Sequence, residues 1–303
     1  MNFSSNTGRP LISVGTWEKV VTYARMVKLS HTVFALPFAL CAAVLAQRTR
    51  PLTLWDIFWL LLAMVGARSA AMGVNRIVDA AIDAQNPRTA TREIPAGRLT
   101  PQSATGFVLF FSGLFILSAA MLGKLCLYLS VPILIILFSY SYTKRFTVLC
   151  HLYLGSVISL APLGAWIALT GSFAWPITLF SAALMTYIAG FDILYACQDV
   201  AFDRQKGLFS IPARFGVPIA LKIAALLHVF AFAFFVSIHF AFDMGNIYLG
   251  TAGAIGILMI AEHRLVKPDD LSRVNIAFFH INSVISLSLF AGVLLDEVAR
   301  KFM

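Results

Sequence analysis

Residues 54–83 read LWDIFWLLLAMVGARSAAMGVNRIVDAAID, an apolar run that ends in a polar stripe. The first part, Leu54–Val74, is long enough to cross the hydrocarbon core of a bilayer as a helix, which takes about 20 residues. Asn75, Asp79 and Asp83 then recur at every fourth residue, a spacing that places them on one face of a helix. The stretch therefore predicts a membrane-spanning helix whose end carries one amide and two carboxylates on the same side.

The composition of the whole chain predicts the same class of protein. Of its 303 residues, 59% are hydrophobic and only 12% are charged, and the mean hydropathy is +0.84. A soluble domain carries about twice that charged fraction, and the alternating pattern typical of a membrane β-barrel is absent. We expect an all-α integral membrane protein with about nine spans: Thr32–Ala46, Leu54–Val74, Ala104–Leu122, Leu125–Tyr142, Leu149–Thr170, Trp175–Ala196, Val217–Phe240, Ile247–Glu262 and Ile276–Leu295.

A second acidic stretch lies 120 residues beyond the first, also at the end of an apolar run. It reads DILYACQDVAFD over residues 192–203, so that Asp192, Asp199 and Asp203 share a helix face. Each stretch alone could be an ordinary helix end exposed to solvent. However, five of the chain's 14 acidic residues lie in these two stretches, which favours a functional role. Divalent cations prefer such oxygen ligands, and two facing stripes would hold cations that bind a diphosphate. The candidate metal ligands are Asn75, Asp79, Asp83, Asp199 and Asp203.

The basic residues predict the orientation in the membrane. With the N-terminus inside, 17 Lys and Arg residues fall in inner segments and five in outer ones. The positive-inside rule then places the N-terminal segment 1–26 and both acidic stretches in the cytoplasm. No apolar signal sequence precedes the first span, and we expect one membrane domain over residues 1–303. The net charge of +9 fits this topology and an anionic ligand, and nothing indicates a nucleic-acid partner or a particular oligomeric state.

Arg68 lies in the middle of a span, seven residues before Asn75 and on the same helix face. An unpaired arginine inside a bilayer costs about 3 kcal/mol or more, so this side chain should face a polar cavity. It either pairs with an aspartate of the stripe or binds an anion, since a guanidinium fits both diphosphate and carboxylate.

Other basic residues also lie beside the predicted site. Arg25 and Lys28 precede the first span, and Lys144 and Arg145 follow the fourth. Topology alone explains them, but next to two acidic clusters they would also complement phosphate. Both acidic stretches run into long loops with Pro, Gly and basic residues, which we interpret as caps over a site. The four cysteines and six histidines show no metal-ligand spacing, and we expect structural roles for them.

These motifs resemble the UbiA superfamily of intramembrane prenyltransferases, in which N-x3-D-x3-D follows the second helix and D-x3-D follows the sixth. Asn75, Asp79, Asp83, Asp199 and Asp203 fill those positions. The similarity covers nearly the whole chain and extends to Arg68, Asp192, Gly207 and the segment Tyr140–Thr147. It implies a helical bundle around a central cavity, with Mg²⁺ as cofactor and a polyprenyl diphosphate as donor.

One position departs from the pattern. Many members have Asn-Asp where this chain has Asn75-Arg76. The surrounding residues are similar to a bacterial branch labelled 4-hydroxybenzoate polyprenyltransferase-like, which implies the bacterial inner membrane. Some members of that branch use a dihydroxynaphthoate in a menaquinone route, so both 4-hydroxybenzoate and 1,4-dihydroxy-6-naphthoate stay open as acceptors. Haem, chlorophyll-precursor, glycerol phosphate lipid and homogentisate acceptors also occur in the superfamily.

The resulting hypothesis assigns a role to each candidate residue. The metal-binding acids and Asp192 form the catalytic group, with Asp192 orienting or deprotonating the acceptor. Basic residues neutralise the leaving diphosphate or hold the acceptor carboxylate. The candidate substrate-binding residues are Arg25, Lys28, Arg68, Asn75, Tyr140, Lys144, Arg145 and Lys206. A cation-coupled transporter is disfavoured because the acids gather at one membrane face, and a non-catalytic prenyl-lipid binder because all four motif aspartates are present.

Overall fold

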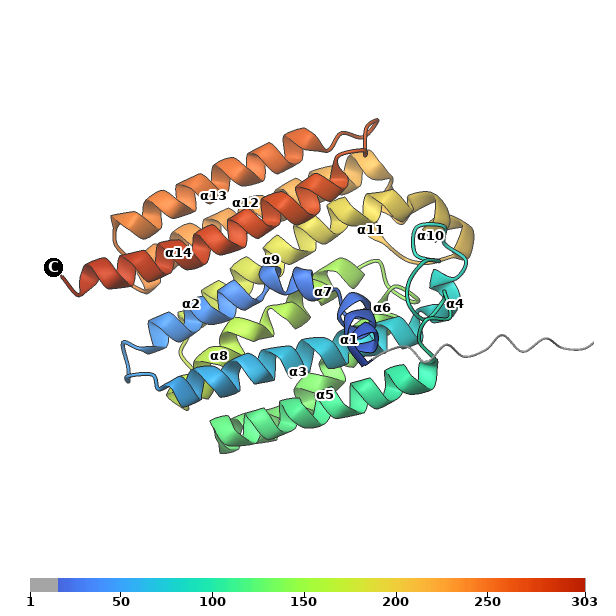
Figure 1. The fold of residues 1–303 in the computed structure, drawn as a ribbon. Helices are drawn as coiled ribbons and strands as arrows, with labels where there is room; N and C mark the ends of the chain where they lie inside the picture. The colour runs from blue at the N-terminus through green and yellow to red at the C-terminus, as the bar shows by residue number, and fades with distance from the viewer. Residues whose placement is uncertain (1–15, 303) are drawn as a thin grey trace, which may run out of the picture.

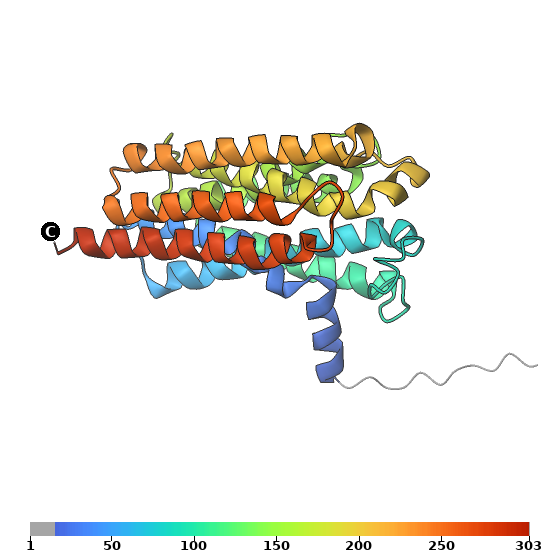
Figure 2. The same ribbon diagram turned by 90° about the horizontal axis from the view of Figure 1, so that it is seen from above.

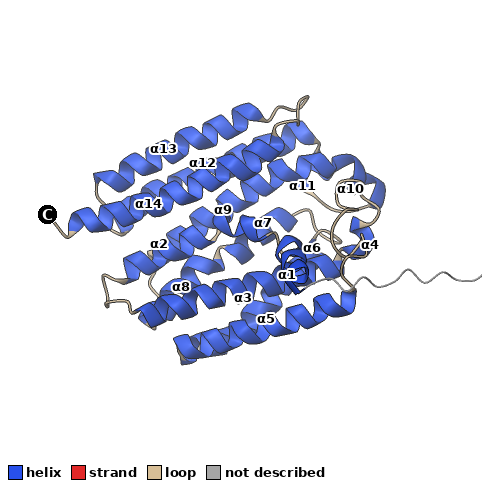
Figure 3. Cartoon of the chain, in the orientation of Figure 1, coloured by secondary structure: helices blue, strands red, loops and turns tan. Residues whose placement is uncertain are grey.

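The computed structural model describes residues 16–302, and within this range the chain is helical without a β-strand (Figure 3). Seven helical segments are long and apolar enough to cross a membrane. They are α3 (Leu54–Val78), α5 (Pro101–Leu122), α6 (Lys124–Thr143), α7–α8 (Cys150–Thr170), α9–α10 (Ile177–Lys206), α12 (Val217–Ala241) and Ile276–Arg300, which ends in α14 (Asn282–Arg300). The all-helical membrane class predicted from the sequence is confirmed.

The predicted number of nine spans is not confirmed. The first expected span divides into a 3₁₀ turn, Leu29–Phe34, and a helix of 11 residues, α2 (Leu36–Ala46), which is shorter than a full crossing. The eighth is α13 (Asn246–Leu265), a helix of 20 residues that is less apolar than the seven. Both helices nevertheless pack within the bundle, α2 against α8 (Leu160–Thr170) and α13 against α14.

The helices lie roughly along one direction, and the short cap elements gather at one end of the bundle (Figure 1). The caps are α4 (Ala80–Asp83), α10 (Val200–Lys206) and α11 (Ile211–Phe215), together with the loop between α4 and α5. The C-terminus lies at the opposite end. Helix α1 (Thr16–Met26) projects away from the bundle (Figure 2). The arrangement places both acidic stretches at the capped end.

The helix ends are fixed by local hydrogen bonds that the sequence encodes. Helix α3 begins with a capping box, in which Thr53 and Asp56 each satisfy the other's backbone N–H. The Thr100 side chain caps α5 by accepting from the Ser103 backbone. Gly66 then lets α3 and α5 approach closely, because a methyl group there would lie 2.9 Å from the backbone nitrogen of Phe115. Capping and close packing together orient α3 toward the site.

A buried polar network joins α9, α13 and α14 away from the acidic stretches. The wholly buried carboxylate of Glu262 accepts a hydrogen bond from Asn282 Nδ2 at 2.8 Å, and the Tyr187 hydroxyl donates to Asn282 Oδ1 at 2.7 Å. Asn282 Nδ2 also donates to two carbonyls of the preceding turn, at 3.1 Å each. That turn is a π-helix, Ile276–Ile281, so the amide satisfies carbonyls where the π-helix meets α14.

Candidate active site

The first acidic stretch is formed where α3 ends and α4 begins. Asn75 Nδ2 donates to Asp79 Oδ2 at 2.9 Å, which fixes the carboxylate one turn further along. Asp79 Oδ1 is buried without a hydrogen-bond partner and lies 3.5 Å from the Arg145 guanidinium. Burial raises the pKa of Asp79, and the nearby Lys144 charge counteracts part of that effect. The buried, unpartnered oxygen is a ready acceptor for a cation.

The second acidic stretch lies at the end of α9. Asp199 closes a 3₁₀ turn, Cys197–Asp199, and Asp203 lies in the first turn of α10. Asp203 is buried and accepts a hydrogen bond from Ser210 Oγ at 2.9 Å. Ser210 also caps α11, so the loop after α10 is folded back over this carboxylate.

The loop after α4 joins the two acidic stretches through two arginines. Arg88 Nε donates to Asp199 Oδ1 at 2.9 Å, and Asn86 Nδ2 donates to the same oxygen at 3.1 Å. Arg92 forms an ion pair with Asp83 at 2.6 Å. Burial lowers the pKa of Arg88, but its hydrogen bonds to Asp199 and Tyr195, together with the charges of these two groups, raise the pKa overall. This loop therefore neutralises one carboxylate of each stretch.

Sequence reasoning did not assign a role to Arg88 or Arg92. Both lie in the loop after α4, which the sequence analysis interpreted as a cap over the site. The partner of Arg88 could not be identified because Asp199 lies 111 residues away in the chain, whereas Asp83 lies only nine residues before Arg92. The only signal was their position within a basic loop that follows the first motif.

The basic residues at the end of α6 lie close to both stretches. Arg145 donates to the Val78 carbonyl at 2.7 Å and faces Asp79. The Lys144 charge lies within electrostatic reach of Asp79, Asp199 and Asp203. Lys206, by contrast, is exposed at the end of α10 and contacts neither cavity described below.

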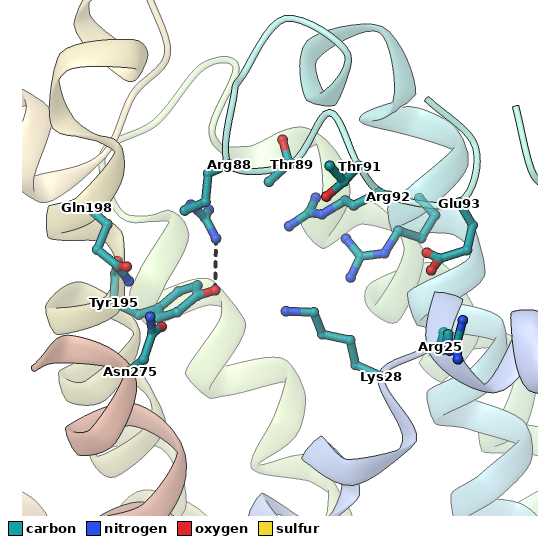
Figure 4. A pocket seen from close by; sticks show the side chains of 11 residues that line it. Arg25, Lys28, Arg88, Thr89, Thr91, Arg92, Glu93, Tyr195, Gln198 and Asn275 are labelled. Carbon is teal, nitrogen blue, oxygen red and sulfur yellow. Dashed lines mark hydrogen bonds between the residues drawn. The ribbon is translucent and has the colours of Figure 1, made fainter. Parts of the chain in front are cut away.

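A cavity of about 380 Å³ lies beneath the loop after α4 (Figure 4). We call it the basic cavity, because five cationic side chains line it beside one carboxylate: Arg25, Lys28, Arg76, Arg88, Arg92 and Glu93. Arg88 donates to the Tyr195 hydroxyl at 2.8 Å along one side of the cavity, the contact drawn in Figure 4. Such a surplus of positive charge is suited to an organic or inorganic anion.

Lys28 occupies an uncommon backbone conformation at the edge of the basic cavity. Its φ of 48° lies in the left-handed region, which side chains other than glycine seldom adopt. The residue separates α1 from the following 3₁₀ turn and directs its ammonium group into the cavity, as Figure 4 shows. Burial, together with the charge of Arg76, lowers the pKa of Lys28 from 10.5 to about 8.

A second cavity, of about 360 Å³, lies between the helices, and we call it the apolar cavity. Along α3 it extends from Leu60 to Arg76, about 24 Å of helix at 1.5 Å per residue. Its walls are mostly apolar and include Leu60, Phe115, Leu122, Leu129, Ile133 and Leu154. The polar groups gather near the capped end: Lys28, Arg68, Asn75, Arg76, Tyr140 and Asp192.

Two residues at this polar end have partners that differ from the expected ones. Arg68 forms no ion pair with an aspartate in the part of the chain described. One of its terminal nitrogens instead donates to the Lys28 carbonyl at 3.2 Å, and its Nε is buried without a partner. Asp192 pairs with His151, which sequence reasoning placed among the structural histidines. The Asp192 Oδ2 to His151 Nδ1 distance is 2.7 Å.

The four motif carboxylates and Asn75 suit a hard divalent cation chemically, because all of them offer oxygen atoms. Asp79 Oδ1 fits such an ion best, since it is buried and accepts no hydrogen bond. Between residues 16 and 302, no three acidic, histidine or cysteine side chains converge on a single point. In this structure Arg92 neutralises Asp83 and Arg88 neutralises Asp199, at the carboxylates that a bound metal ion would otherwise neutralise.

The comparisons with known proteins agree with this fold. The profile described as the UbiA prenyltransferase family matches residues 35–284. A 4-hydroxybenzoate octaprenyltransferase of Nitrosospira multiformis is 30% identical over 240 residues, which are 79% of this chain and 82% of that protein. One from Vibrio campbellii is 25% identical and covers 92% of this chain and 98% of its own.

Solved structures show the same architecture. A UbiA homolog from Aeropyrum pernix K1 superimposes with a TM-score of 0.80 at 34% identity, covering 88% of this chain and 98% of that one. An Archaeoglobus fulgidus UbiA homolog bound to DMAPP and Mg²⁺ has a TM-score of 0.69 at 17% identity, over 90% of this chain and 99% of that one, and shares the fold. This multi-pass membrane chain belongs to the UbiA prenyltransferase family.

Proposed function

We propose that this protein transfers a polyprenyl group from a polyprenyl diphosphate to a ring carbon of a hydroxy-aromatic acid, with Mg²⁺, for quinone biosynthesis. The observation that carries the proposal is the apolar cavity, which runs from the bundle interior to Asn75 and Asp192, the first residues of the two acidic stretches. Curated relatives are named 4-hydroxybenzoate octaprenyltransferases, and solved homologs of the same fold bind DMAPP or GPP with Mg²⁺.

In this proposal the donor diphosphate binds at the capped end of the bundle. Asn75, Asp79 and Asp83 would hold one Mg²⁺, and Asp199 and Asp203 a second. These ions neutralise the leaving diphosphate when bound. Lys144 and Arg145 stabilise the negative charge that grows as the C–O bond breaks and the diphosphate leaves with the bonding electrons. Lys206 was also predicted for this role, and its exposed position gives that assignment no support.

The apolar cavity receives the prenyl chain and excludes water from the allylic cation that forms. The ring carbon ortho to the acceptor hydroxyl then supplies the electron pair of the new C–C bond. Asp192 orients the hydroxyl, or takes its proton during the attack and returns it afterwards. The ring carbon then loses its proton to a base such as the released diphosphate, which restores aromaticity. Arg68, or Arg25 and Lys28 in the basic cavity, hold the acceptor carboxylate.

A second candidate acceptor, 1,4-dihydroxy-6-naphthoate, is supported by Arg76. This buried guanidinium lines both cavities and donates to the Met26 carbonyl at 3.1 Å. It stands where many members of the superfamily carry an aspartate, so this motif resembles the branch in which some members use a dihydroxynaphthoate. We further propose that the site faces the cytoplasm at a bacterial inner membrane and that residues 1–303 form one domain.

The test uses membranes that contain the protein, Mg²⁺, a labelled polyprenyl diphosphate and each acceptor in parallel. We expect product with one acceptor and none when EDTA is added. Asp79→Asn should lower turnover by about 100-fold or more, since it removes a charged ligand, while membrane insertion is unchanged. Product formation by the Asn variant at the wild-type rate would refute the metal assignment, and no product with either acceptor would refute the aromatic-acid assignment.

A further inference from the structure

His151 is a buried histidine that the proposed reaction does not yet use. It lies in the first turn of α7 (Cys150–Ile158), and its side chain is 5% exposed. Its Nδ1 is 2.7 Å from Asp192 Oδ2 on α9, and its Nε2 is buried without a hydrogen-bond partner. In the part of the chain described, the ring's one hydrogen bond is to a residue of the apolar cavity, and the thiol of the adjacent Cys150 is its other polar neighbour.

The packing of α7 on α9 fixes this contact. Gly155 lies one helical turn after His151, and a methyl group in its place would collide with the Met185 carbonyl oxygen and contact Ala189. Met185 and Ala189 precede Asp192 on α9 by two turns and one turn. Because the two backbones approach so closely, the His151 ring reaches the Asp192 carboxylate directly.

In the His151–Asp192 pair, the histidine is the hydrogen-bond donor and the carboxylate is the acceptor. A His151 tautomer with its proton on Nε2 would turn the Nδ1 lone pair toward the carboxylate, which is unfavourable. In the other neutral tautomer and in the imidazolium, Nδ1 carries a proton and donates to Asp192 Oδ2. Asp192 Oδ1 accepts no hydrogen bond from any residue between 16 and 302, and Asp192 lines the polar end of the apolar cavity with Tyr140 and Arg68.

We propose that His151 is a positioning residue: its Nδ1–H holds Asp192 by Oδ2 so that Oδ1 is free to meet the acceptor hydroxyl. This inference rests on the proposed function, because it concerns how the acceptor is oriented. A fixed carboxylate binds the hydroxyl in one geometry, whereas a free one would rotate or pair with Arg68. His151 touches neither substrate and acts only through Asp192.

The decisive comparison is between two polar substitutions of similar size. His151→Asn keeps an N–H near the position of Nδ1, and His151→Gln moves the amide toward the position of Nε2. We expect kcat of the Asn variant within about threefold of wild type, and kcat of the Gln variant lower by about 10- to 100-fold, the effect of losing a hydrogen bond to a charged group. The KM for the prenyl diphosphate should stay unchanged in both.

A double-mutant cycle between His151 and Asp192, together with a matched control variant, completes the test. If His151 acts through Asp192, then His151→Gln should cause no further loss in an Asp192→Asn background. His239→Gln changes a half-buried histidine of α12 that lines neither cavity, and its kcat should equal that of wild type. Thermal unfolding of each purified variant in detergent separates lost function from lost stability.

The outcomes are distinguishable. Equal kcat values for the Asn and Gln variants, or additive losses in the cycle, would overturn the role of His151 while the wild-type enzyme remains a prenyltransferase. A rise in the donor KM that matches the fall in kcat would also overturn it, since that result indicates a general distortion of the cavity. A wild-type protein that prenylates no aromatic acid would overturn the proposed function and this inference together.

Discussion

Lys28 combines a left-handed backbone with a lowered pKa, and both follow from its place at the edge of the basic cavity. Because its pKa is about 8 in the fold against 10.5 unfolded, the folded protein binds fewer protons between these values. Folding is therefore favoured as the pH rises through this window. The ammonium charge available for an anion is lost over the same range.

We expect kcat/KM for the aromatic acid to fall as the pH rises through about 8, in step with the free-enzyme pKa of Lys28. Lys28→Arg should keep activity at pH 9, because a guanidinium stays protonated. Lys28→Met should lower kcat/KM at pH 7 and flatten the profile. A wild-type profile that stays level to pH 9.5 would show that Lys28 does not bind the substrate anion.

Arg88 is the second residue whose effect can be isolated. Arg88→Met leaves Asp199 with only the bond from Asn86, and the metal-free protein should lose about 1–2 kcal/mol of unfolding free energy. Arg98→Met is the matched control, because the Arg98 side chain is half exposed, its ion pair with Glu93 is long, at 3.7 Å, and its hydrogen bond to the Thr91 carbonyl is exposed. Thermal unfolding in detergent without metal should show a lower Tm for the first variant only; equal Tm values would mean that Arg88 contributes no net stability.

At the scale of elements, the π-helix Ile276–Ile281 links the buried network to the apolar cavity. The Asn282 amide donates to two carbonyls of this π-helix. The side chain of Phe278, which belongs to the same π-helix, lines the apolar cavity and stacks on Tyr195, with 4.1 Å between the ring centroids. A π-turn interrupts the regular hydrogen-bond ladder of a helix and persists where other groups compensate. The network therefore supports the cavity wall without contacting a substrate.

Asn282→Ala should destabilise the protein by about 2–3 kcal/mol, because it leaves the Glu262 carboxylate and two carbonyls without their donor. We also expect a higher KM for the prenyl diphosphate, since Phe278 would shift. Asn246→Ala at the exposed start of α13 should change the Tm little. An unaltered Tm and KM in Asn282→Ala would contradict the supporting role of the network.

For the whole molecule, the sequence predicted the helical membrane class and the positions of the acidic stretches, because both depend on local patterns. Long apolar runs predict membrane-spanning helices, and polar residues four positions apart are predicted to share a helix face. Contacts between distant segments leave no such mark. His151 reaches Asp192 only because Gly155 brings α7 close to α9, and Arg88 meets Asp199 only because the loop folds across the bundle end.

The predicted number of nine spans is not confirmed, because α2 and α13 are too short or too polar to count as spans by length and composition. Thr32–Ala46 was expected to cross the bilayer, but Leu29–Phe34 forms a 3₁₀ turn that leaves α2 short. Packing of α2 on α8 and α14 stabilises a half-length helix that hydropathy alone does not distinguish from a full one. The site roles of the individual residues remain predictions that the variants above test.

Metal removal should leave the fold intact, because the arginine pairs already balance Asp83 and Asp199. We expect the Tm in EDTA to lie within about 2 °C of that in Mg²⁺ alone, and to rise clearly once a diphosphate is added with Mg²⁺. Differential scanning fluorimetry of the purified protein in detergent would measure this. Loss of the cooperative transition in EDTA would show instead that the ions hold the capped end together.

The loop that carries Arg88 and Arg92 also bears on how the protein is made. Nascent chains enter the membrane before they meet their substrates, and a cluster of uncompensated carboxylates at that stage would resist burial. Arg88 and Arg92 of the same polypeptide neutralise two of these carboxylates, so we expect assembly in the membrane to need no metal ion. We therefore expect a cell short of divalent cations to accumulate folded, inactive protein rather than misfolded chains that are degraded.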